Sequence, residues 1–211
     1  MKKLFIIAFL ALGFYQAQAQ VTFRPGLRGG LNFSHFTKGD FGNSNGGYYD
    51  YNGNYIPYSN PEFTSKTDFY IGFYGALKLS KFYTLQPEVD YSNQGTTIKY
   101  SNSSSNKLNA SYLSIAVVNK FSFSDKFNVH LGPTIDFVVD KDFNVDSDVD
   151  LAFILGAGYD INKNIGIEAR VKKGIIPAFY NSYNDGSYYY SDSNHTNVVF
   201  SVGATYTFDV K

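Results

Sequence analysis

The sequence predicts an all-β protein, an eight-stranded antiparallel up-and-down transmembrane β-barrel. Eight stretches alternate strictly between apolar residues and polar or small ones, and a period of two is that of a β-strand. The connections between these stretches alternate between long and short, which is typical of a barrel with loops on one side of a membrane and turns on the other. No internal run approaches the roughly 18 apolar residues of a transmembrane helix, so we expect the strands themselves to cross.

The clearest pattern lies in residues 151–171, which form two predicted strands around the short turn 160–164. This turn is rich in Asp and Asn, which tolerate turn geometry. One face of the hairpin is apolar, with Leu151, Phe153, Leu155, Ala157, Tyr159, Ile165, Ile167, Ala169 and Val171. The other face mixes very small residues with long charged ones, namely Ala152, Ile154, Gly156, Gly158, Gly166, Glu168, Arg170 and Lys172.

An export signal precedes the first strand. Lys2 and Lys3 are followed by an apolar run over 4–15 and by Ala17-Gln18-Ala19, a small-x-small cleavage pattern. We expect cleavage after Ala19, which leaves a signal peptide at 1–19 and an outer-membrane β-barrel domain at 20–211. Without Lys2 and Lys3 the 18 basic residues fall to 16 against 18 acidic ones, a balance that argues against nucleic acid as a partner. The chain contains no cysteine and therefore no disulfide.

The other six strands are expected at 26–36, 68–79, 83–100, 108–121, 127–138 and 196–208. The long connections are 37–66, 101–107, 139–149 and 178–195, and the remaining short turns are 80–82 and 122–126. An even number of strands places both ends of the barrel domain on the short-turn side, which is the periplasmic side for an exported chain. Pro87 and Pro133 conflict with this assignment because proline cannot donate to a ladder, so we expect a bulge or a ladder end at each.

Residue size distinguishes a membrane barrel from a soluble, lipocalin-like barrel, in which the apolar face would point inward. The lumen of an eight-stranded barrel is only wide enough to be filled by side chains. Small residues on the mixed face leave room there for charged ones, and they are Gly30, Gly72, Ala76, Gly132, Gly156, Gly158, Gly166, Gly174 and Gly203. Aromatic residues near the strand ends of the apolar face suit the interfacial girdles of a membrane barrel, and they are Phe33, Phe69, Phe121, Phe127, Tyr159 and Phe208.

Several short motifs resemble the small outer-membrane β-barrel family of porin-like, PorT-type or OmpA-like eight-stranded proteins. They are Leu85-Gln86-Pro87-Glu88-Val89 with Tyr91-Ser92 and Gln94-Gly95, Leu131-Gly132-Pro133, Gly156-Ala157-Gly158-Tyr159 and Glu168-Ala169-Arg170. The chain departs from the family at Ser114 and Ala116, where Glu and Pro are common, and at Asp209, Val210 and Lys211, which follow the final aromatic residue. The resemblance implies the fold and the outer membrane, and it implies no single activity.

Charged residues on the mixed face are expected to form a network inside the barrel. They are Arg28, Lys78, Glu88, Asp90, Lys120, Glu168 and Arg170. Opposite charges should meet there because an unpaired buried charge is costly. The network either blocks the lumen or merely fills it, and His130 is expected to be a hydrogen-bonding residue beside it.

Two of the long connections are rich in tyrosine. Mixtures of Tyr with Asn, Ser and Gly suit adaptable recognition surfaces because Tyr offers contact area at low entropic cost. The candidate recognition residues are Tyr48, Tyr49, Tyr51, Tyr55, Tyr188, Tyr189 and Tyr190, with Tyr58, Tyr180 and Tyr183 nearby. An extracellular glycan or protein would be their ligand, and a self-packed loop is the alternative.

Two further patterns are weaker. Asp140, Asp142, Asn144, Asp146, Asp148 and Asp150 alternate along one edge. They begin like a calcium loop, but Val145 and Leu151 replace its Gly and Glu, so we expect a solvated hairpin and no metal site. His35 and His195 should lie near each other at the outer rim, close to Ser34, Ser191 and Asp192, but no spacing among them indicates catalysis.

The sequence therefore predicts an outer-membrane barrel of structural or surface-recognition type, without a cofactor and without enzymatic activity. Its expected surroundings are outer-membrane lipid and lipopolysaccharide. A narrow porin, or a component of a secretion apparatus bound to the other subunits, is the competing hypothesis. A membrane-barrel enzyme comes third.

Overall fold

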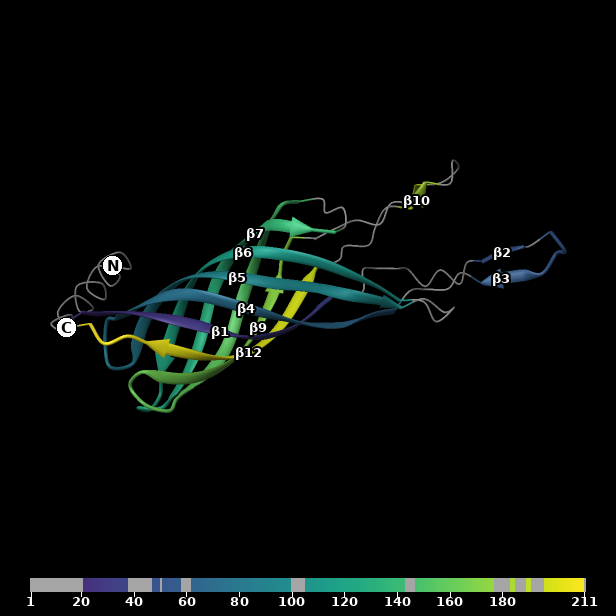
Figure 1. Ribbon diagram of the computed structural model, residues 1–211. Coiled ribbons are helices and arrows are strands. Elements are labelled where there is room, and N and C mark those ends of the chain that lie inside the picture. The colour runs from purple at the N-terminus through teal and green to yellow at the C-terminus, as the bar shows by residue number, and fades with distance from the viewer. Residues whose placement is uncertain are drawn as a thin grey trace, which may run out of the picture.

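The computed structural model confirms the closed eight-stranded barrel (Figure 1). The structure describes residues 21–37, 47–49, 51–57, 62–99, 105–142, 147–176, 183–184, 189–190 and 196–210. All pairings in the barrel are antiparallel, and the order around it is β1-β12-β9-β8-β7-β6-β5-β4. The expected signal peptide at 1–19 lies outside the described residues.

The eight barrel strands include every stretch with strict alternation, and two short hairpins accompany them. The barrel consists of β1 (Thr22–Phe36), β4 (Glu62–Lys78), β5 (Tyr83–Lys99), β6 (Ser105–Ser122), β7 (Phe127–Lys141), β8 (Val149–Asp160), β9 (Ile165–Gly174) and β12 (Asn197–Thr207). The hairpins are β2 (Gly47–Tyr49) with β3 (Tyr55–Pro57) and β10 (Tyr183–Asn184) with β11 (Tyr189–Tyr190). They lie within the tracts expected to be long loops, beyond the long-connection end of the barrel (Figure 1).

Several strands are longer at this outer end than the alternation indicates, whereas β5 agrees with the expected strand 83–100 within one residue. β4 starts at Glu62 rather than at residue 68, so the connection between β1 and β4 is shorter than the expected loop 37–66. β4, β5 and β6 continue together to the pairs Glu62–Lys99 and Lys99–Ser105. Their last residues are mostly Ser, Thr, Asn and Lys, and a strand with two polar faces shows no alternation. β7 and β8 likewise extend into the expected acidic loop, to Lys141 and from Val149.

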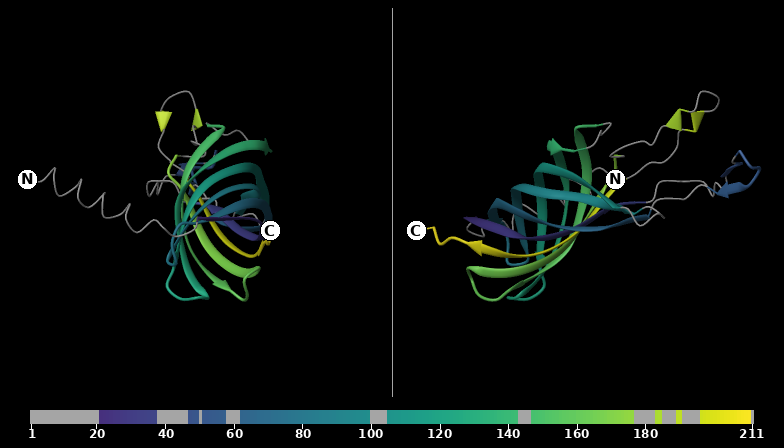
Figure 2. Two further views of the ribbon diagram at one scale, coloured as in Figure 1. Left: turned by 90° about the vertical axis from the view of Figure 1, so that its left-hand side faces the viewer. Right: turned by 45° about the vertical axis from the view of Figure 1, so that its right-hand side comes forward.

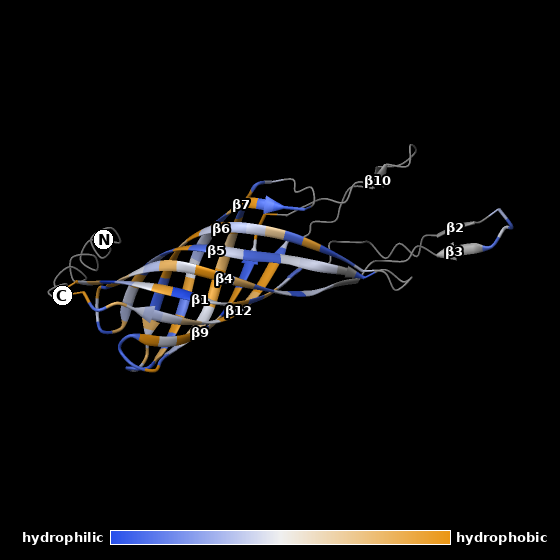
Figure 3. Ribbon diagram, viewed as in Figure 1, coloured by the Kyte–Doolittle hydropathy of each residue, from blue (hydrophilic) through white to orange (hydrophobic). Residues whose placement is uncertain are grey.

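The alternation places the apolar face outward and the polar face in the lumen. Side chains such as Phe73, Leu155 and Ile167 are exposed on the outer surface, whereas most of the buried side chains inside are polar or charged. Figure 3 shows the apolar residues along the barrel strands, and the left view of Figure 2 looks roughly along the barrel axis. This inside-out distribution is that of a barrel in lipid. No helix among the described residues is both long and apolar enough to span a bilayer.

The two prolines interrupt the ladders locally. Between β4 and β5 the pairing passes from Tyr74–Glu88 to Leu77–Leu85 without a pair at Pro87. Between β6 and β7 it passes from Ala116–Thr134 to Asn119–Leu131 without a pair at Pro133. The register is the same on both sides of each gap, so the prolines are accommodated by missing pairs and not by bulges.

The three short turns share one hydrogen-bonding device. In each turn the residue three positions before the next strand accepts two backbone N–H groups through its side-chain oxygen: Ser80 from Phe82 and Tyr83, Ser124 from Lys126 and Phe127, and Asn162 from Asn164 and Ile165. Such local bonds define tight turns. Both ends of the barrel sheet lie at this side, where the N–H of Phe208 donates to the carbonyl of Pro25. A hydrogen bond from Lys163 lowers the pKa of Asp209 on this rim.

Candidate functional site

Arg28 is the centre of a buried ionic cluster in the middle of the lumen. Its guanidinium group contacts three carboxylates from two other strands, β5 and β9: Asp90 at 2.5 Å, Glu168 at 2.5 Å and Glu88 at 3.0 Å. The side chain also lies over the ring of Tyr70, 4.7 Å from its centroid. Tyr70 in turn donates its hydroxyl to Glu168 over 3.1 Å. β1, β4, β5 and β9 are thereby connected through the lumen.

Arg170 provides the second positive charge of this cluster. Its guanidinium nitrogens bind both oxygens of Glu88 at 2.7 and 2.9 Å and lie 2.9 Å from Glu168. Its Nε donates to Nδ1 of His130 over 3.1 Å. Since arginine can only donate, Nδ1 of His130 accepts, so the ring is neutral and its Nε2 donates to Oδ1 of Asn128 at 2.7 Å.

The cluster is sealed from solvent. Arg28, Glu88, Asp90, Glu168 and Arg170 are each 6% exposed or less. A bidentate arginine–carboxylate pair is among the strong hydrogen-bonded contacts of proteins. The arrangement therefore forms a side-chain plug across the lumen.

Small residues give the plug its space. A Cβ on Gly156 would lie 2.6 Å from Cγ of Arg170, and a Cβ on Gly72 would lie 2.7 Å from Cγ of Asp90. Contacts this short are sterically forbidden. The glycines of the mixed face thus accommodate the charged side chains of the neighbouring strands.

We expect Gly156→Ala to lower the free energy of unfolding by about 1–3 kcal/mol, because an added methyl group overpacks the lumen. Gly29→Ala is the matched control on the outer face, where the new Cβ would lie 3.2 Å from the nearest atom. Urea unfolding in detergent measures both variants. An equal decrease in unfolding free energy at the two positions would contradict the conclusion that the glycines of the mixed face make room for the charged side chains.

A second, uncharged constriction lies towards the outer end of the lumen. Ser34 accepts the N–H of Gly95 at 2.8 Å and donates to the carbonyl of Gly95 at 3.0 Å. Asn32 donates to the carbonyl of Asn93, and Asn197 donates to Gln94. Ser34 and Gln94 are fully buried.

This outer cap depends on an irregularity in β4 and β5. The register between these strands shifts between Ser65 and Tyr70, and Gly95 takes a φ of +152°, which favours glycine. β5 thereby approaches β1, whose Asn32 and Ser34 side chains bind the backbone of β5. In the sequence, Gln94-Gly95 belongs to a family motif, and the alternation does not predict its contact with β1.

The structure brings five of the seven predicted lumenal residues together and separates two. Lys120 lies closer to the short-turn end and pairs with Asp160 at 3.2 Å. Lys78, the last residue of β4, is exposed. Both strands extend past the cluster, so an inward-facing side chain at their ends does not reach it.

A second ionic group, which was not predicted from the sequence, lies on the long-connection side of the cluster. Lys172 pairs with Asp136, which also accepts the hydroxyl of Thr134 at 2.9 Å. Asp136 faces Asp150 across the β7–β8 ladder, and both carboxylates are buried. Asp136 and Lys172 stand at inward positions of the alternation, so the signal was present, but it did not identify their partners.

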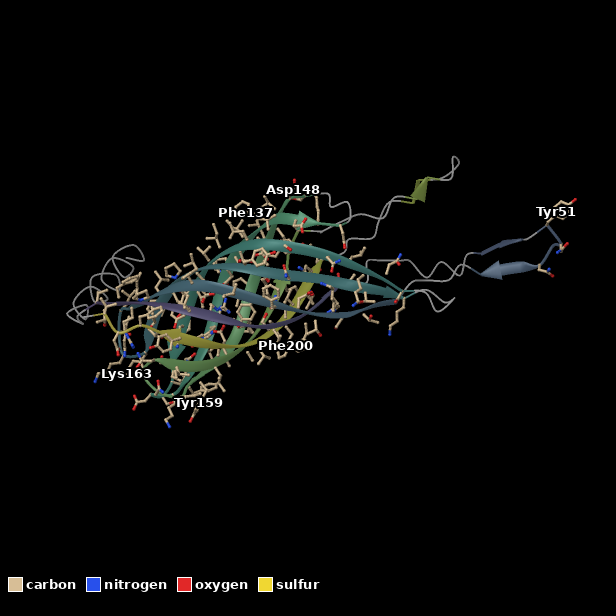
Figure 4. All side chains as sticks on the ribbon, in the orientation of Figure 1. Tyr51, Phe137, Asp148, Tyr159, Lys163 and Phe200 are labelled. Carbon is tan, nitrogen blue, oxygen red and sulfur yellow. The ribbon has the colours of Figure 1, made fainter. Side chains whose placement is uncertain are left out.

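Those other candidate residues that the structure describes lie at the outer end. Tyr51 is fully exposed at the turn between β2 and β3 (Figure 4). The backbones of Tyr48, Tyr49 and Tyr55 pair within that hairpin, and those of Tyr189 and Tyr190 belong to β11. Tyr188, His195, Ser191 and Asp192 lie outside the described residues.

The acidic tract forms local bonds at its two ends. Asp142 accepts from the side chain of Asn109, and Asp148 pairs with Lys141 at 2.6 Å. Asn144 and Asp146 lie outside the described residues. Within the described part of the chain, no group of three or more His, Cys, Asp or Glu side chains could hold a metal ion.

The chain matches one family model and is similar to several solved structures of outer-membrane barrels. A family model described as an outer membrane protein beta-barrel domain matches residues 14–180. The Neisserial surface protein A structure is 12% identical, with a TM-score of 0.50 over 87% of this chain and 97% of that one. OprG from Pseudomonas aeruginosa is 14% identical, with a TM-score of 0.48 over 90% and 98%. Outer membrane protein W of E. coli is 16% identical, with a TM-score of 0.41 over 90% and 100%. No curated protein matches the chain.

Proposed function

We propose, from the premise that this chain belongs to the outer membrane protein β-barrel family, that it is a closed barrel with a structural or surface-recognition role. Membership of the family implies an outer-membrane location. The proposal of this specific role is based on the filled lumen and on the residues at the outer end of the barrel. A catalytic role is not part of the proposal.

The observation that carries the proposal is the filled lumen. Arg28 and Arg170 bind three carboxylates in the middle of the barrel, and the outer cap closes it again between Ser34 and Gln94. A narrow porin or a secretion conduit needs a continuous aqueous path. Two closures in series support a non-conducting barrel, so the transport hypothesis comes second.

The outer end supports the recognition part of the proposal. β4, β5 and β6 extend beyond the shorter strands β9 and β12 and provide a rigid base for the outer connections. Tyr51 is exposed at the tip of the β2–β3 hairpin (Figure 4). An exposed aromatic side chain on such a tip suits contact with a glycan or with a protein surface. Outer-membrane lipid and lipopolysaccharide would surround the apolar belt.

We expect proteases added to whole cells to cleave within 37–61 and 177–195 and to spare the short turn 122–126. The long connections lie at one end of the barrel and the short turns at the other (Figure 1), so only one end can face the medium. Mass spectrometry of the released peptides measures the result. Cleavage at 122–126 in intact cells would invert the topology.

Recognition itself can be tested with the mature barrel in nanodiscs on a glycan array and against immobilised extracellular proteins. A variant in which Tyr48, Tyr49, Tyr51 and Tyr55 are replaced by Ser should lose the binding of the parent protein. The matched control replaces Tyr159, an exposed aromatic residue of the short-turn end. Absence of binding by the parent protein, or equal binding by the loop variant, would contradict the recognition role of this hairpin.

A further inference from the structure

The three short turns form one connected surface with the strand ends beside them, which we call the short-turn rim. It comprises residues 22–25, 78–84, 120–128, 159–166 and 206–210. The N–H of Ser122 donates to the carbonyl of Phe82 at 2.8 Å, and the N–H of Asp160 donates to the carbonyl of Lys126 at 2.7 Å. A further backbone bond joins the third turn to β12. Side chains of different turns are therefore held in fixed positions relative to one another.

Basic side chains outnumber acidic ones on the short-turn rim. The basic residues are Arg24, Lys78, Lys81, Lys120, Lys126 and Lys163, and the acidic residues are Asp125, Asp160 and Asp209. Arg24 and Lys163 share Asp209, and Lys120 pairs with Asp160. Within the described part of the chain, the other three lysines form no ion pair, and Asp125 is the one acidic residue left to offset them. The rim therefore has an excess of positive charge.

Large apolar side chains lie beside these lysines. Phe82, which follows Lys81, and Phe123, in the turn that contains Lys126, are each 70% exposed. Ile161 is exposed in the third turn. Apolar surface of this size is unfavourable in water, whereas the boundary between headgroups and acyl chains accommodates it. The combination of apolar side chains with flexible lysines is that of a surface at a membrane interface.

An aromatic girdle places the lysines at the depth of the lipid headgroups. Tyr83 packs against Phe121 with ring centroids 5.4 Å apart. The ammonium group of Lys126 lies 5.8 Å from the ring centroid of Tyr159, and Figure 4 shows Tyr159 at this end of the barrel. Aromatic girdles of membrane barrels lie at the two interfaces. A lysine that contacts this girdle is therefore within reach of the lipid phosphates.

We propose that the short-turn rim binds the phosphate groups of anionic phospholipids through Lys81 and Lys126. A lysine ammonium is a compact positive charge that donates hydrogen bonds to phosphate, and anionic lipids attract basic side chains near the membrane surface. A zwitterionic headgroup brings its own positive charge and does not neutralise the excess on the rim. The inference is independent of any ligand of the outer loops, and it also holds if the barrel conducts.

Native mass spectrometry of the mature barrel in a non-ionic detergent tests the proposal. Phosphatidylglycerol should be retained several-fold more than phosphatidylcholine with the same acyl chains. The double variant Lys81→Gln/Lys126→Gln should retain phosphatidylglycerol no better than phosphatidylcholine. The matched control Lys99→Gln/Lys107→Gln removes the same charge from exposed lysines of the outer end and should keep the preference. All four side chains are exposed, so we expect both variants to fold.

Thermal unfolding in bicelles provides a second measurement on the unaltered protein. The midpoint should be higher in phosphatidylglycerol than in phosphatidylcholine, and the difference should decrease with added salt because salt screens exposed charges. Equal retention of the two lipids by the unaltered protein, or a preference that survives in Lys81→Gln/Lys126→Gln, would overturn the proposal. Loss of the preference in both double variants would show that total charge selects the lipid and would likewise overturn it.

Discussion

Arg28→Met is expected to lower the free energy of unfolding by about 3–5 kcal/mol, the cost of leaving buried partners without their counter-charge. Arg28 contacts Glu88, Asp90 and Glu168 within 3.0 Å. Its loss leaves three buried carboxylates facing Arg170 alone. Methionine has a similar length, so the cavity that the substitution creates contributes less than the lost charge.

Arg24→Met is the matched control, since Arg24 lies on the same strand at the short-turn rim. Its ion pair with Asp209 joins side chains that are 29% and 55% exposed, and such pairs contribute about 1 kcal/mol or less. Urea unfolding of both variants in the same detergent provides the comparison. If Arg28→Met lowers the free energy of unfolding no more than Arg24→Met does, the central cluster does not stabilise the barrel.

The sequence was sufficient for the architecture because an eight-stranded barrel in lipid has two contrasting faces. Alternation identified the strands, and the glycines of the mixed face identified the lumen. Gly156 illustrates the reason, because its missing side chain is the space that Arg170 occupies. The inward positions of Arg28 and Glu88, on strands far apart in the chain, follow from the same alternation.

The pairing inside the lumen could not be predicted in the same way. Which inward side chains meet depends on the stagger between strands and on lateral contacts between strands that are not neighbours. Lys172 pairs with Asp136 of β7, two strands away, and no local pattern indicates that contact. Lys78 faces the same way as Tyr74 but stands past the end of the lumen.

The outer cap and the strand extensions were missed for a different reason. Residues 62–66 are Glu, Phe, Thr, Ser and Lys, and residues 105–107 are Ser, Asn and Lys, which carry too little apolar character to show an alternation. The strand expected at 83–100 did include the outer part of β5. The register shift of β4 against β5 accompanies the contacts of β5 with Asn32 and Ser34 of β1. Tertiary contacts, and not local preference, determine this part of the barrel.

The largest functional effect is expected from opening both closures of the lumen. Planar-bilayer recording of the unaltered barrel should show no large, stable conductance, because a barrel of this size is filled by its own side chains. Arg170→Ala removes the group that binds Glu88 and Glu168, so it should admit water to the centre and produce a small leak. The outer cap remains, with Ser34 and Gln94 fully buried.

Combining Arg170→Ala with Gln94→Gly should raise the leak several-fold above that of either single variant, because two barriers in series limit flow until both are lowered. Gln94→Gly alone, which leaves the ionic cluster intact, is the control. If Arg170→Ala alone conducts as well as the double variant, the outer cap is not a barrier. Large and stable openings of the unaltered protein would refute the closed lumen and make the narrow porin the leading hypothesis.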